Sequence, residues 1–541
     1  MCIKAIHPNL TSTIKDPPAK DKSIESRLNP YDSVNYPPFS MPVTHIGRLS
    51  AIGHLFGIDI AHPKVARVLE LGCGQGTNLL AMAQLFPDGK FVGVDYSETQ
   101  IDLARSAAKG SGIDNVQFLF ADICDLGKDL GEFDYIISHG VYSWISDPAK
   151  KALLRISKEN LSPNGIAYVS YNCLPGWKMR GALRDMMLMH TGNLEDPMEK
   201  VGQSKALLGF LAGACNQDSA YGKFLSAELN LLIKCDDSYI AHEFLEDEND
   251  AFYFSDFNRD AQSFGLQYLG DAEPASMMMA DIPEEAQKAF SQLKGNQVAT
   301  EQYLDFLRNR TFRCSLLCHP ELQFNRNIKT NRVHGMTAVS LIELKQALEG
   351  DQPAIFTTQG GDEISVTDPA TALVLEAIAH NKSVPVDVLI DSLLEPLKAI
   401  AEGENEEAAI IGLIGTILLR AYFTKTLDFF TSELTLSEPS PGNPCVLPLA
   451  RWQAANNQKV SNYHLSMKGV DAIVATLIQL CDGTRSPEAI RSQILESVHN
   501  KQFNFNENEE VVTDPDRQKQ LVVNFYQSSI DKLKHFRLLV P

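Results

Sequence analysis

The chain has 541 residues, of which 44% are hydrophobic and 21% charged, and its net charge at pH 7 is −20. A chain of this length is expected to form about three globular domains, each able to bury a core. The acidic balance, with no cluster of Lys and Arg to oppose it, disfavours nucleic acid as a partner.

The cysteines and apolar runs indicate where the protein resides. The ten cysteines include no CxxC pair, and Cys314 and Cys318, followed by His319, lack further ligands at zinc spacing. We therefore expect no metal and a reducing, cytoplasmic location. The first thirty residues lack the apolar stretch of a signal sequence, and the longest apolar run, Ala408 to Leu419, is too short to span a bilayer. Stable membrane insertion is not expected.

Residues 1–29 are rich in Lys, Ser, Asp and Pro and are predicted to be a flexible N-terminal segment. Residues 30–195 then alternate strands with helices. The strands are predicted at Ala66–Leu71, Phe91–Asp95, Val116–Phe120, Phe133–Ile137 and Ile166–Tyr171, and the helices at Asn78–Phe86, Thr99–Lys109 and Ala149–Asn160, with a turn at Ser162–Gly165. Helical crossovers of this length predict a parallel, doubly wound, Rossmann-like α/β sheet.

Beyond residue 195 the pattern becomes mostly helical. We predict a mostly helical middle domain at 196–349 and a mostly helical C-terminal domain at 363–541. The stretch Gly350–Asp362, which contains Gly, Gln and Asp, is predicted to be the linker between them.

The segment Glu70-Leu71-Gly72-Cys73-Gly74-Gln75-Gly76 indicates a ligand-binding loop after the first strand. Alternating glycines let a backbone turn tightly and approach a ligand, and the N-terminus of the following helix attracts an anionic group. Such a loop suits a dinucleotide pyrophosphate or the carboxylate of a methionine. Position 77 is Thr77, so the dinucleotide motif GxGxxG is not met. Glu70 suits the cationic amino-acid end of S-adenosyl-L-methionine, which we expect as the cofactor.

Polar residues at the ends of the next strands extend this site. Asp95 is placed to accept from both ribose hydroxyls, and Asp122 from the adenine amino group with Ile123 against the ring. Alone, a glycine loop or a strand-end aspartate is more often a turn or a helix cap, but several in order on consecutive strands favour a site. The residues expected to bind the cofactor are Tyr36, Glu70, Gly72, Cys73, Gly74, Gly76, Asn78, Asp95, Tyr96, Gln100, Asp122, Ile123, Ser138 and His139.

The sequence also resembles a known family over most of its length. The segments that carry the resemblance are ELGCGQGTNLL (70–80), FVGVDYSETQI (91–101), FDYIISHGVYSWI (133–145), LSPNGIAYVSYN (161–172), PGW (175–177), HEFLEDENDAFYFSDF (242–257), GLQYL (265–269), EQYLDFLRNR (301–310) and CDGTR (481–485). They resemble class I S-adenosylmethionine-dependent methyltransferases with a methyltransferase regulatory domain, and among these the rickettsial lysine methyltransferases of an outer-membrane protein. The chain departs from that pattern at Leu174, where an aromatic residue is frequent, and at Ile46, where proline is usual.

The resemblance implies lysine as the methyl acceptor. A lysine ammonium has a pKa of ~10.4 and must lose its proton first, which an apolar, aromatic pocket favours by desolvation. The candidate catalytic residues near the ends of the last two strands are His139, Tyr142, Trp144, Tyr171, Asn172 and Trp177, with Tyr36 as part of a lid. Each aromatic residue alone fits core packing equally well.

Two other functions remain open: methylation of a small molecule, and a regulatory protein that binds S-adenosylmethionine without transferring its methyl group. The expected partner is a protein substrate, such as an outer-membrane or surface protein before export, and a homodimer is implied by the resemblance. A nucleic-acid amino methyltransferase is disfavoured, because Tyr171-Asn172 is followed by Cys173-Leu174-Pro175 rather than by the loop that grips a flipped base.

Overall fold

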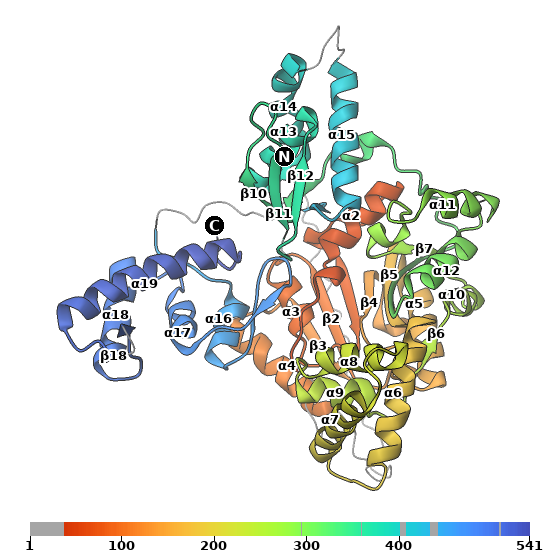
Figure 1. The fold of residues 1–541 in the computed structure, drawn as a ribbon, viewed down its shortest axis with the longest axis horizontal. Helices are drawn as coiled ribbons and strands as arrows, with labels where there is room; N and C mark the ends of the chain where they lie inside the picture. Colours follow the sequence, from red (N-terminus) through yellow and green to blue (C-terminus); the bar gives the residue numbers. More distant parts are fainter. Residues whose placement is uncertain are drawn as a thin grey trace, which may run out of the picture.

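The computed structural model describes residues 37–293, 295–358, 360–400, 407–432, 442–507 and 510–540. The predicted flexible segment 1–29 and the candidate lid residue Tyr36 lie outside the described residues. Figure 1 shows a central sheet with three additions around it: one above, one below and one to the side. In the described part of the chain, no helix is long and apolar enough to cross a membrane.

The five predicted strands are present and lie side by side. They are β1 (Arg67–Leu71), β2 (Lys90–Asp95), β3 (Val116–Phe120), β4 (Phe133–Ser138) and β5 (Leu161–Cys173). They pair in parallel in the order β3-β2-β1-β4-β5. This is the Rossmann-like arrangement that the strand-helix alternation predicts.

Both faces of the sheet are covered, as a doubly wound sheet requires. Neighbouring residues of β1 point to opposite faces, and Val68 and Leu69 accordingly belong to two different hydrophobic cores. The helices along these strands are α2 (Ile46–Phe56), α3 (Thr77–Ala83), α4 (Glu98–Ser111) and α5 (Asp147–Glu159). Core residues of α2, α3 and α4 share a cluster with Val68, and those of α5 share one with Leu69.

The predicted turn Ser162–Gly165 is instead part of β5. The pairing of β4 with β5 jumps from Phe133–Leu161 to Tyr135–Ile166, so the polar segment is accommodated as a bulge in a longer strand. A side-chain hydrogen bond from Asn164 Nδ2 to the Asp59 carbonyl at 2.8 Å holds it. The predicted turn is therefore wrong, because the strand continues through these residues.

The sheet does not end at β5, and it is not purely parallel. It has eight strands, because β8 (Phe312–Cys318) pairs antiparallel with β5, β7 (Gln267–Asp271) pairs with β8, and β6 (Ala251–Phe252) pairs with the end of β5. Residues 249–318, called the middle region from here on, therefore cover what would be an exposed edge of the sheet. Cys314 and Cys318 lie on β8 and are buried in the core.

The middle region also contains three helices, α10 (Phe254–Ser263), α11 (Glu284–Phe290) and α12 (Gln297–Arg308). A fully buried arginine, Arg313 of β8, joins α12 to the sheet. Its guanidinium contacts Glu301 and Asp305 at 2.8 Å each and Asp271 at 3.5 Å. A buried cation requires such compensation by negative charge, so we interpret these acidic residues of α12 and β7 as stabilising the folded state.

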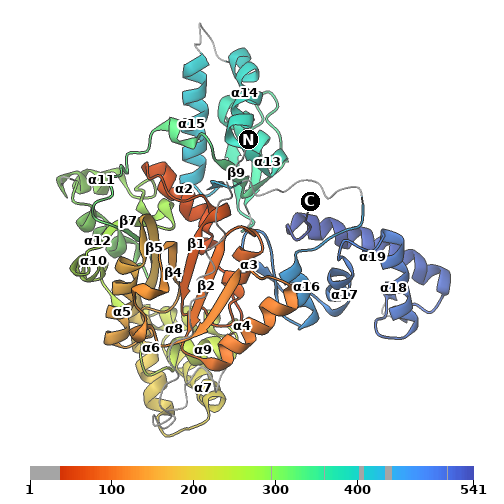
Figure 2. The same cartoon turned by 180° about the vertical axis from the view of Figure 1, so that it is seen from behind.

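A helical unit lies at the carboxyl ends of the parallel strands. Figures 1 and 2 both place α8 and α9 beside those ends, at the foot of the molecule. The unit consists of α6 (Gly176–Thr191), α7 (Pro197–Ala214), α8 (Ala220–Leu232) and α9 (Asp237–Phe244), which share a hydrophobic core of their own. Its first helix follows directly from β5, so its residues border the edge at which the site is predicted.

The addition at the top of Figure 1 contains two small sheets and three helices. The strands are β9 (Thr337–Ser340), β10 (Ile342–Gln346), β11 (Ala354–Thr358), β12 (Glu363–Val366), β13 (Ser383–Pro385) and β14 (Leu427–Phe430), and the helices are α13 (Pro369–Asn381), α14 (Val386–Ile400) and α15 (Glu407–Phe423). The predicted linker Gly350–Asp362 is wrong, because it contains β11, which pairs antiparallel with β10 and β12. Ala354 and Phe356 alternate inward and are fully buried, as in a strand.

The C-terminal region is largely helical, as predicted. It contains α16 (Pro448–Ala455), α17 (Ala472–Leu480), α18 (Pro487–His499) and α19 (Pro515–His535), with short hairpins formed by β15 (Val460–Ser461) and β16 (Met467–Lys468), and by β17 (Asn506–Glu507) and β18 (Glu510–Val511). Trp452 of α16 docks on α4, where a Cβ on Gly110 would come within 2.2 Å of the indole. Gln84, just after α3, accepts from the Leu449 backbone at 3.1 Å.

Candidate active site

The glycine loop leaves β1 at the carboxyl edge of the sheet. Gly72, Gly74 and Gly76 have φ values of 75°, 51° and 68°, in the left-handed region that favours glycine. A Cβ on Gly72 would lie 2.4 Å from Val141, and one on Gly76 would lie 2.4 Å from Phe118. Those two glycines are thus required by packing. A Cβ on Gly74 would meet only Gln100 Oε1, at 4.0 Å, so this part of the loop has space beside it.

Asp95 holds the loop in place from the end of β2. Its Oδ2 accepts from the Gly74 N–H at 2.8 Å and its Oδ1 from the Ser97 N–H at 2.9 Å. Ser97 in turn caps α4 by accepting from Gln100 N. Gln100 is buried, yet neither its Oε1 nor its Nε2 has a hydrogen-bond partner among the described residues. A buried amide without partners is costly, which points to a bound ligand beside the loop.

Glu70 is the second buried group of this kind. Its Oε1 accepts from Asn78 Nδ2 at 2.7 Å, while its Oε2 has no partner within the described chain. Burial raises the pKa of Glu70 to about 8, the Asn78 hydrogen bond opposes that rise, and the charge of Asp95 adds to it. Asn78 is itself fixed, because its Oδ1 accepts from the Met41 backbone at 2.9 Å and from Thr44 Oγ1 at 3.1 Å.

The remaining cofactor candidates lie around the same edge. Asp122 follows β3 and caps the 3-10 turn Ile123–Asp125 by accepting from Cys124 N at 2.8 Å. Ser138 ends β4 and is buried, with no partner for its hydroxyl in the described residues. Tyr96 is 61% exposed, and Cys73 is buried with a raised thiol pKa, chiefly through burial. The described candidates therefore follow strands that end at the same edge of the sheet, and Tyr36 lies outside the described residues.

His139 follows β4 and is held against β5. Its Nδ1 is 2.7 Å from the Tyr168 hydroxyl, the two rings are stacked, and Phe312 approaches edge-on. Burial lowers the pKa of His139 to about 4, so the imidazole is neutral at pH 7. One ring nitrogen of His139 thus forms a hydrogen bond with the Tyr168 hydroxyl.

Two of the candidate catalytic aromatics pack in the core. Tyr171 is fully buried, its hydroxyl is 3.0 Å from Ser315 Oγ, and its ring stacks on Phe257 at 4.1 Å. Tyr142 is 2% exposed and lies between Phe252 and Phe257. These contacts match the core-packing alternative for both residues, and a direct catalytic role for them stays a prediction.

Asn172 lies one residue further along β5 and links the sheet to the middle region. Its backbone N–H donates to Ser143 Oγ at 2.8 Å, and its Nδ2 approaches Asn249 Oδ1 at 3.4 Å. Asn249 donates to the Glu243 carbonyl at 2.9 Å. Trp144, in the loop after β4, is half-buried and its N–H donates to the Val141 carbonyl at 2.8 Å.

Trp177 is the second residue of α6. It lies at the centre of a charged cluster whose other members were not identified from the sequence. Its ring stacks with Phe244 of α9 at 6.2 Å, and the Arg180 guanidinium lies over it at 5.7 Å. Arg180 Nε is 3.3 Å from Glu228 Oε2 on α8. Burial raises the pKa of Glu243 to about 7, and Arg180 opposes that rise. Nothing in the local pattern distinguishes Glu228 and Glu243, because only the packing of α6, α8 and α9 brings them together.

Three family models match separate parts of the chain. Residues 62–227 match a methyltransferase domain, residues 236–319 a predicted methyltransferase regulatory domain, and residues 442–538 the C-terminal winged helix domain of PKMT. The first of these contains the glycine loop, Asp95 and Trp177. The second contains Glu243 and Asn249.

Relatives extend the similarity to nearly the whole chain. The uncharacterized protein RP789 of Rickettsia prowazekii is 32% identical over 533 residues, which cover 95% of this chain and 94% of that protein. The structure of PKMT2 from Rickettsia typhi, also solved in complex with AdoHcy, superposes with a TM-score of 0.83 at 31% identity over 94% of this chain and 100% of that chain. The yeast protein-lysine N-methyltransferase EFM4 is 38% identical over 82 residues, which cover 15% of this chain and 36% of that protein.

Proposed function

The chain belongs to the methyltransferase family that includes PKMT2 of Rickettsia typhi, and on that basis we propose that it is an S-adenosylmethionine-dependent protein-lysine methyltransferase. The observation that carries the proposal is the pair of buried, unsatisfied groups beside the glycine loop, Glu70 Oε2 and the Gln100 amide. A ligand with a charged amino-acid end and further polar groups would satisfy them.

The residues at the carboxyl edge fit such a cofactor. We assign Glu70 to its amino group, the Gly72–Gly76 loop to its carboxylate, Asp95 to the ribose hydroxyls and Asp122 to the adenine amino group. When bound, S-adenosylmethionine supplies a methyl group on a positively charged sulfur. The contribution of the protein is then to orient the acceptor and to exclude water around it.

The cluster around Trp177 has the chemistry that an ammonium acceptor needs. The two carboxylates of Glu228 and Glu243 outnumber the single guanidinium of Arg180, so the cluster attracts a cation, while the Trp177 ring holds Arg180 by a cation–π contact. Because the pKa of Glu243 lies near 7, its carboxylate can take up the proton that the lysine must lose and release it to solvent. Asn172 and Asn249 lie beside this cluster and would direct the amine.

The test is incubation with methyl-labelled S-adenosylmethionine and a lysate separated into membrane-protein, soluble-protein and small-molecule fractions. We expect label on lysine side chains of a protein band, and none with Asp95→Ala. Label confined to small molecules would establish the small-molecule alternative. Cofactor binding without any label or S-adenosylhomocysteine would establish the regulatory alternative.

We propose further that the substrate is an outer-membrane or surface protein methylated before export. The enzyme would then act in the cytoplasm, with which the nine described cysteines, all of them free, are compatible. Mass spectrometry of the labelled bands from the separated lysate tests this, because label only on proteins that are neither outer-membrane or surface proteins nor their precursors would exclude this substrate class.

We propose a homodimer that uses the outer surface of α6–α8 and the residues after α8. Large apolar side chains are exposed there, namely Met179, Met189, Met198, Phe210, Tyr221, Leu231 and Ile233. Phe210 is 70% exposed, and burial of such side chains against a second copy would stabilise an interface. Light scattering after gel filtration would give the mass of a dimer, and Phe210→Glu is expected to reduce it to that of a monomer.

A further inference from the structure

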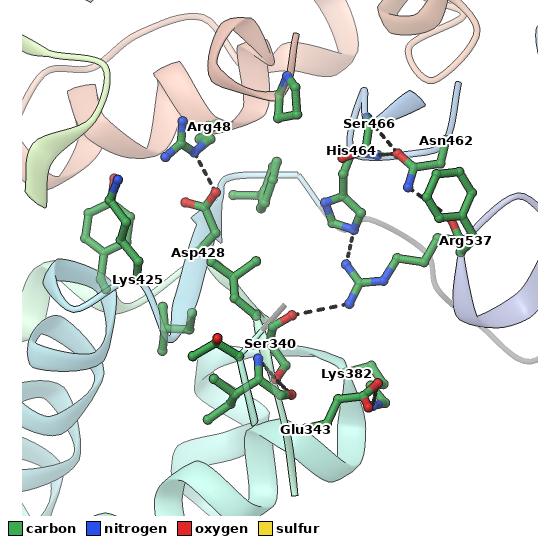
Figure 3. A pocket seen from close by; sticks show the side chains of 18 of the residues that line it. Arg48, Ser340, Glu343, Lys382, Lys425, Asp428, Asn462, His464, Ser466 and Arg537 are labelled. Atoms are coloured by element: carbon green, nitrogen blue, oxygen red, sulfur yellow. Dashed lines mark hydrogen bonds and ion pairs between the residues drawn. The ribbon is translucent and has the colours of Figure 1, made fainter. Parts of the chain in front are cut away.

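A cavity lies away from the predicted cofactor site, where the central sheet, the upper addition and the C-terminal region meet. It has a volume of about 820 Å³, and none of its lining residues belongs to the predicted cofactor site. Figure 3 shows Arg48 of α2 on one side, Ser340 of β9 below, and His464 and Arg537 of the C-terminal region opposite Arg48. A cavity of this size is typical of sites for small organic molecules.

The carboxylates that line the cavity are all paired with cations. Asp428 contacts Arg48 at 2.5 Å, and Glu273 contacts Arg48 and Lys425 at 3.0 Å each. Glu343 is 3.6 Å from Lys382 and 3.5 Å from His535. The negative charge of the cavity wall is therefore already compensated.

Arg537 differs from Arg48, the other arginine that lines the cavity. Its Nη1 contacts His464 Nε2, and its Nη2 lies 3.5 Å from the Ser340 carbonyl, as Figure 3 shows. Neither partner is charged: the Ser340 carbonyl is neutral, and burial and the neighbouring Arg537 lower the pKa of His464 well below its usual value, so its imidazole is neutral. Within the described residues, no carboxylate forms an ion pair with Arg537. The contrast is with Arg48 and Arg313, which contact two and three carboxylates.

Arg537 keeps hydrogen-bonding capacity toward the cavity. A guanidinium has five N–H donors in a planar fork, and His464 and Ser340 engage only two of them. The half-buried guanidinium is costly without an anion, and burial lowers its pKa to about 10. Its position is fixed, since the backbone of Arg537 accepts from Tyr463 N at 3.3 Å, and Asn462 Nδ2 donates to the Phe536 carbonyl at 2.9 Å.

We propose that this cavity binds a small molecule bearing a phosphate group or a comparable oxyanion, with Arg537 as the principal contact. The planar fork of arginine matches two oxygens of such a group. The net charge of −20 repels extended polyanions, so the ligand is a small molecule and not a nucleic acid. The volume of about 820 Å³ leaves room for more than the anionic group itself.

The cavity is connected to the cofactor site through hydrogen bonds and through two pairs of neighbouring residues in the chain, His464–Leu465 and Ser40–Met41. Ser40 Oγ contacts Ser461 Oγ at 3.1 Å and the Leu465 carbonyl at 2.8 Å, next to His464. The following residue, Met41, donates its N–H to Asn78, which donates to Glu70. Occupancy of the cavity is therefore expected to change the affinity for the cofactor, and the effect must be reciprocal.

The experiment is calorimetric titration of the whole protein with inorganic phosphate and with pyrophosphate, at constant ionic strength. Wild type is expected to bind one equivalent, and Arg537→Gln to bind roughly tenfold more weakly or not at all. Lys425→Gln is the matched control, because it removes a positive charge from the same cavity at a residue paired with Glu273, and it should bind as wild type does. Should Arg537→Gln not fold, Arg537→Lys serves instead, with weakened binding expected because the fork is lost.

Two outcomes would overturn the proposal: no phosphate or pyrophosphate binding by wild type, or equal losses in Arg537→Gln and Lys425→Gln. Titration with S-adenosylhomocysteine in the presence and absence of phosphate then tests the coupling. An affinity that changes several-fold in wild type but not in Arg537→Gln would establish it, whereas an unchanged wild-type affinity would refute it. Phosphate binding needs no methyl transfer, so these results do not depend on the proposed activity.

Discussion

The buried carboxyl of Glu70 makes cofactor affinity depend on pH. Burial raises its pKa to about 8, so at pH 7 roughly one molecule in ten carries the ionised form that attracts an ammonium group. Removing the proton at pH 7 therefore costs about 1.4 kcal/mol of the binding free energy. Affinity for S-adenosylhomocysteine should rise about tenfold from pH 6 to pH 7 and level off above pH 8.

The substitution Glu70→Gln isolates this effect. Glutamine keeps the size of the side chain and an oxygen that can accept from Asn78, but it cannot ionise. Titration calorimetry at pH 6, 7 and 8 should show weak and pH-independent binding by the variant. Glu98→Gln, an exposed residue in the first turn of α4, is the control and should keep the wild-type slope. A flat wild-type profile, or a slope that persists in Glu70→Gln, would refute the assignment.

The same carboxyl has a second consequence for stability in the absence of ligand. Its pKa is about 8 in the folded chain and near 4.5 when unperturbed, so the folded state binds the proton more tightly. The free energy of unfolding therefore falls as pH rises from 4.5 to 8, by at most about 5 kcal/mol. Because glutamine does not ionise, the free energy of unfolding of Glu70→Gln should not show this decrease with pH. Thermal unfolding should show the variant to be more stable than wild type at pH 8 and similar to it near pH 4.5.

Three further substitutions test other parts of the structure. Asp95→Ala should reduce cofactor affinity by ~100-fold or more in calorimetry, because it removes the carboxylate assigned to the ribose hydroxyls and the acceptor that holds Gly74 N in the loop. The fold should change little, because Asp95 lies at a strand end; wild-type-like affinity would contradict the role given to Asp95. Trp177→Phe keeps an aromatic ring against Phe244 and should lower turnover far more than cofactor affinity, whereas equal losses would place Trp177 outside the acceptor site. Arg313→Met should lower the free energy of urea unfolding by about 3–5 kcal/mol, because it leaves buried carboxylates unpaired, while Arg259→Met at the surface should change it little, and similar shifts in the two would refute the buried cluster.

The parallel half of the sheet was predictable because its signals are local. Each strand from β1 to β5 is a short apolar run followed by glycine, aspartate or a polar turn, and each crossover helix has its own apolar spacing. The antiparallel strands β7 and β8 were not predictable in that way. Nothing within 312–318 indicates that β8 pairs with β5, which lies more than a hundred residues earlier, and nothing within 267–271 indicates that β7 pairs with β8.

The hairpin around β11 shows how composition can mislead. Gly350, Gln352 and Asp362 are typical of a linker, and they are indeed turn residues, but Ala354 and Phe356 between them alternate inward. A five-residue strand flanked by turns has too short an alternation to stand out from a loop. The pairing with β10 and β12, which decides the matter, is a tertiary contact.

The meeting of the cofactor candidates at one edge of the sheet was predictable for a related reason. Glu70, the glycines and Asp95 lie at strand ends, and the carboxyl ends of parallel strands meet at one edge. Tyr142 and Tyr171 also follow or end strands, yet they point into the core between the sheet and α10. The direction in which a side chain leaves a strand end depends on register, which sequence alone does not define.

The middle region contributes contacts to the candidate active site in addition to covering the sheet edge. β6 pairs with the last residues of β5, the Leu174 N–H donates to the Phe252 carbonyl at 2.9 Å, and the Asp250 N–H donates to the Ser143 carbonyl at 2.8 Å. Asn249 from the same segment contacts the Asn172 side chain. The geometry at the end of β5 is therefore built jointly by the methyltransferase and the regulatory parts of the chain. A displacement of residues 249–252 would disturb these contacts to Asn172 and Leu174, whereas none of the contacts named here involves Glu70 or Asp95, so regulation through this region is expected to act on the proposed acceptor side.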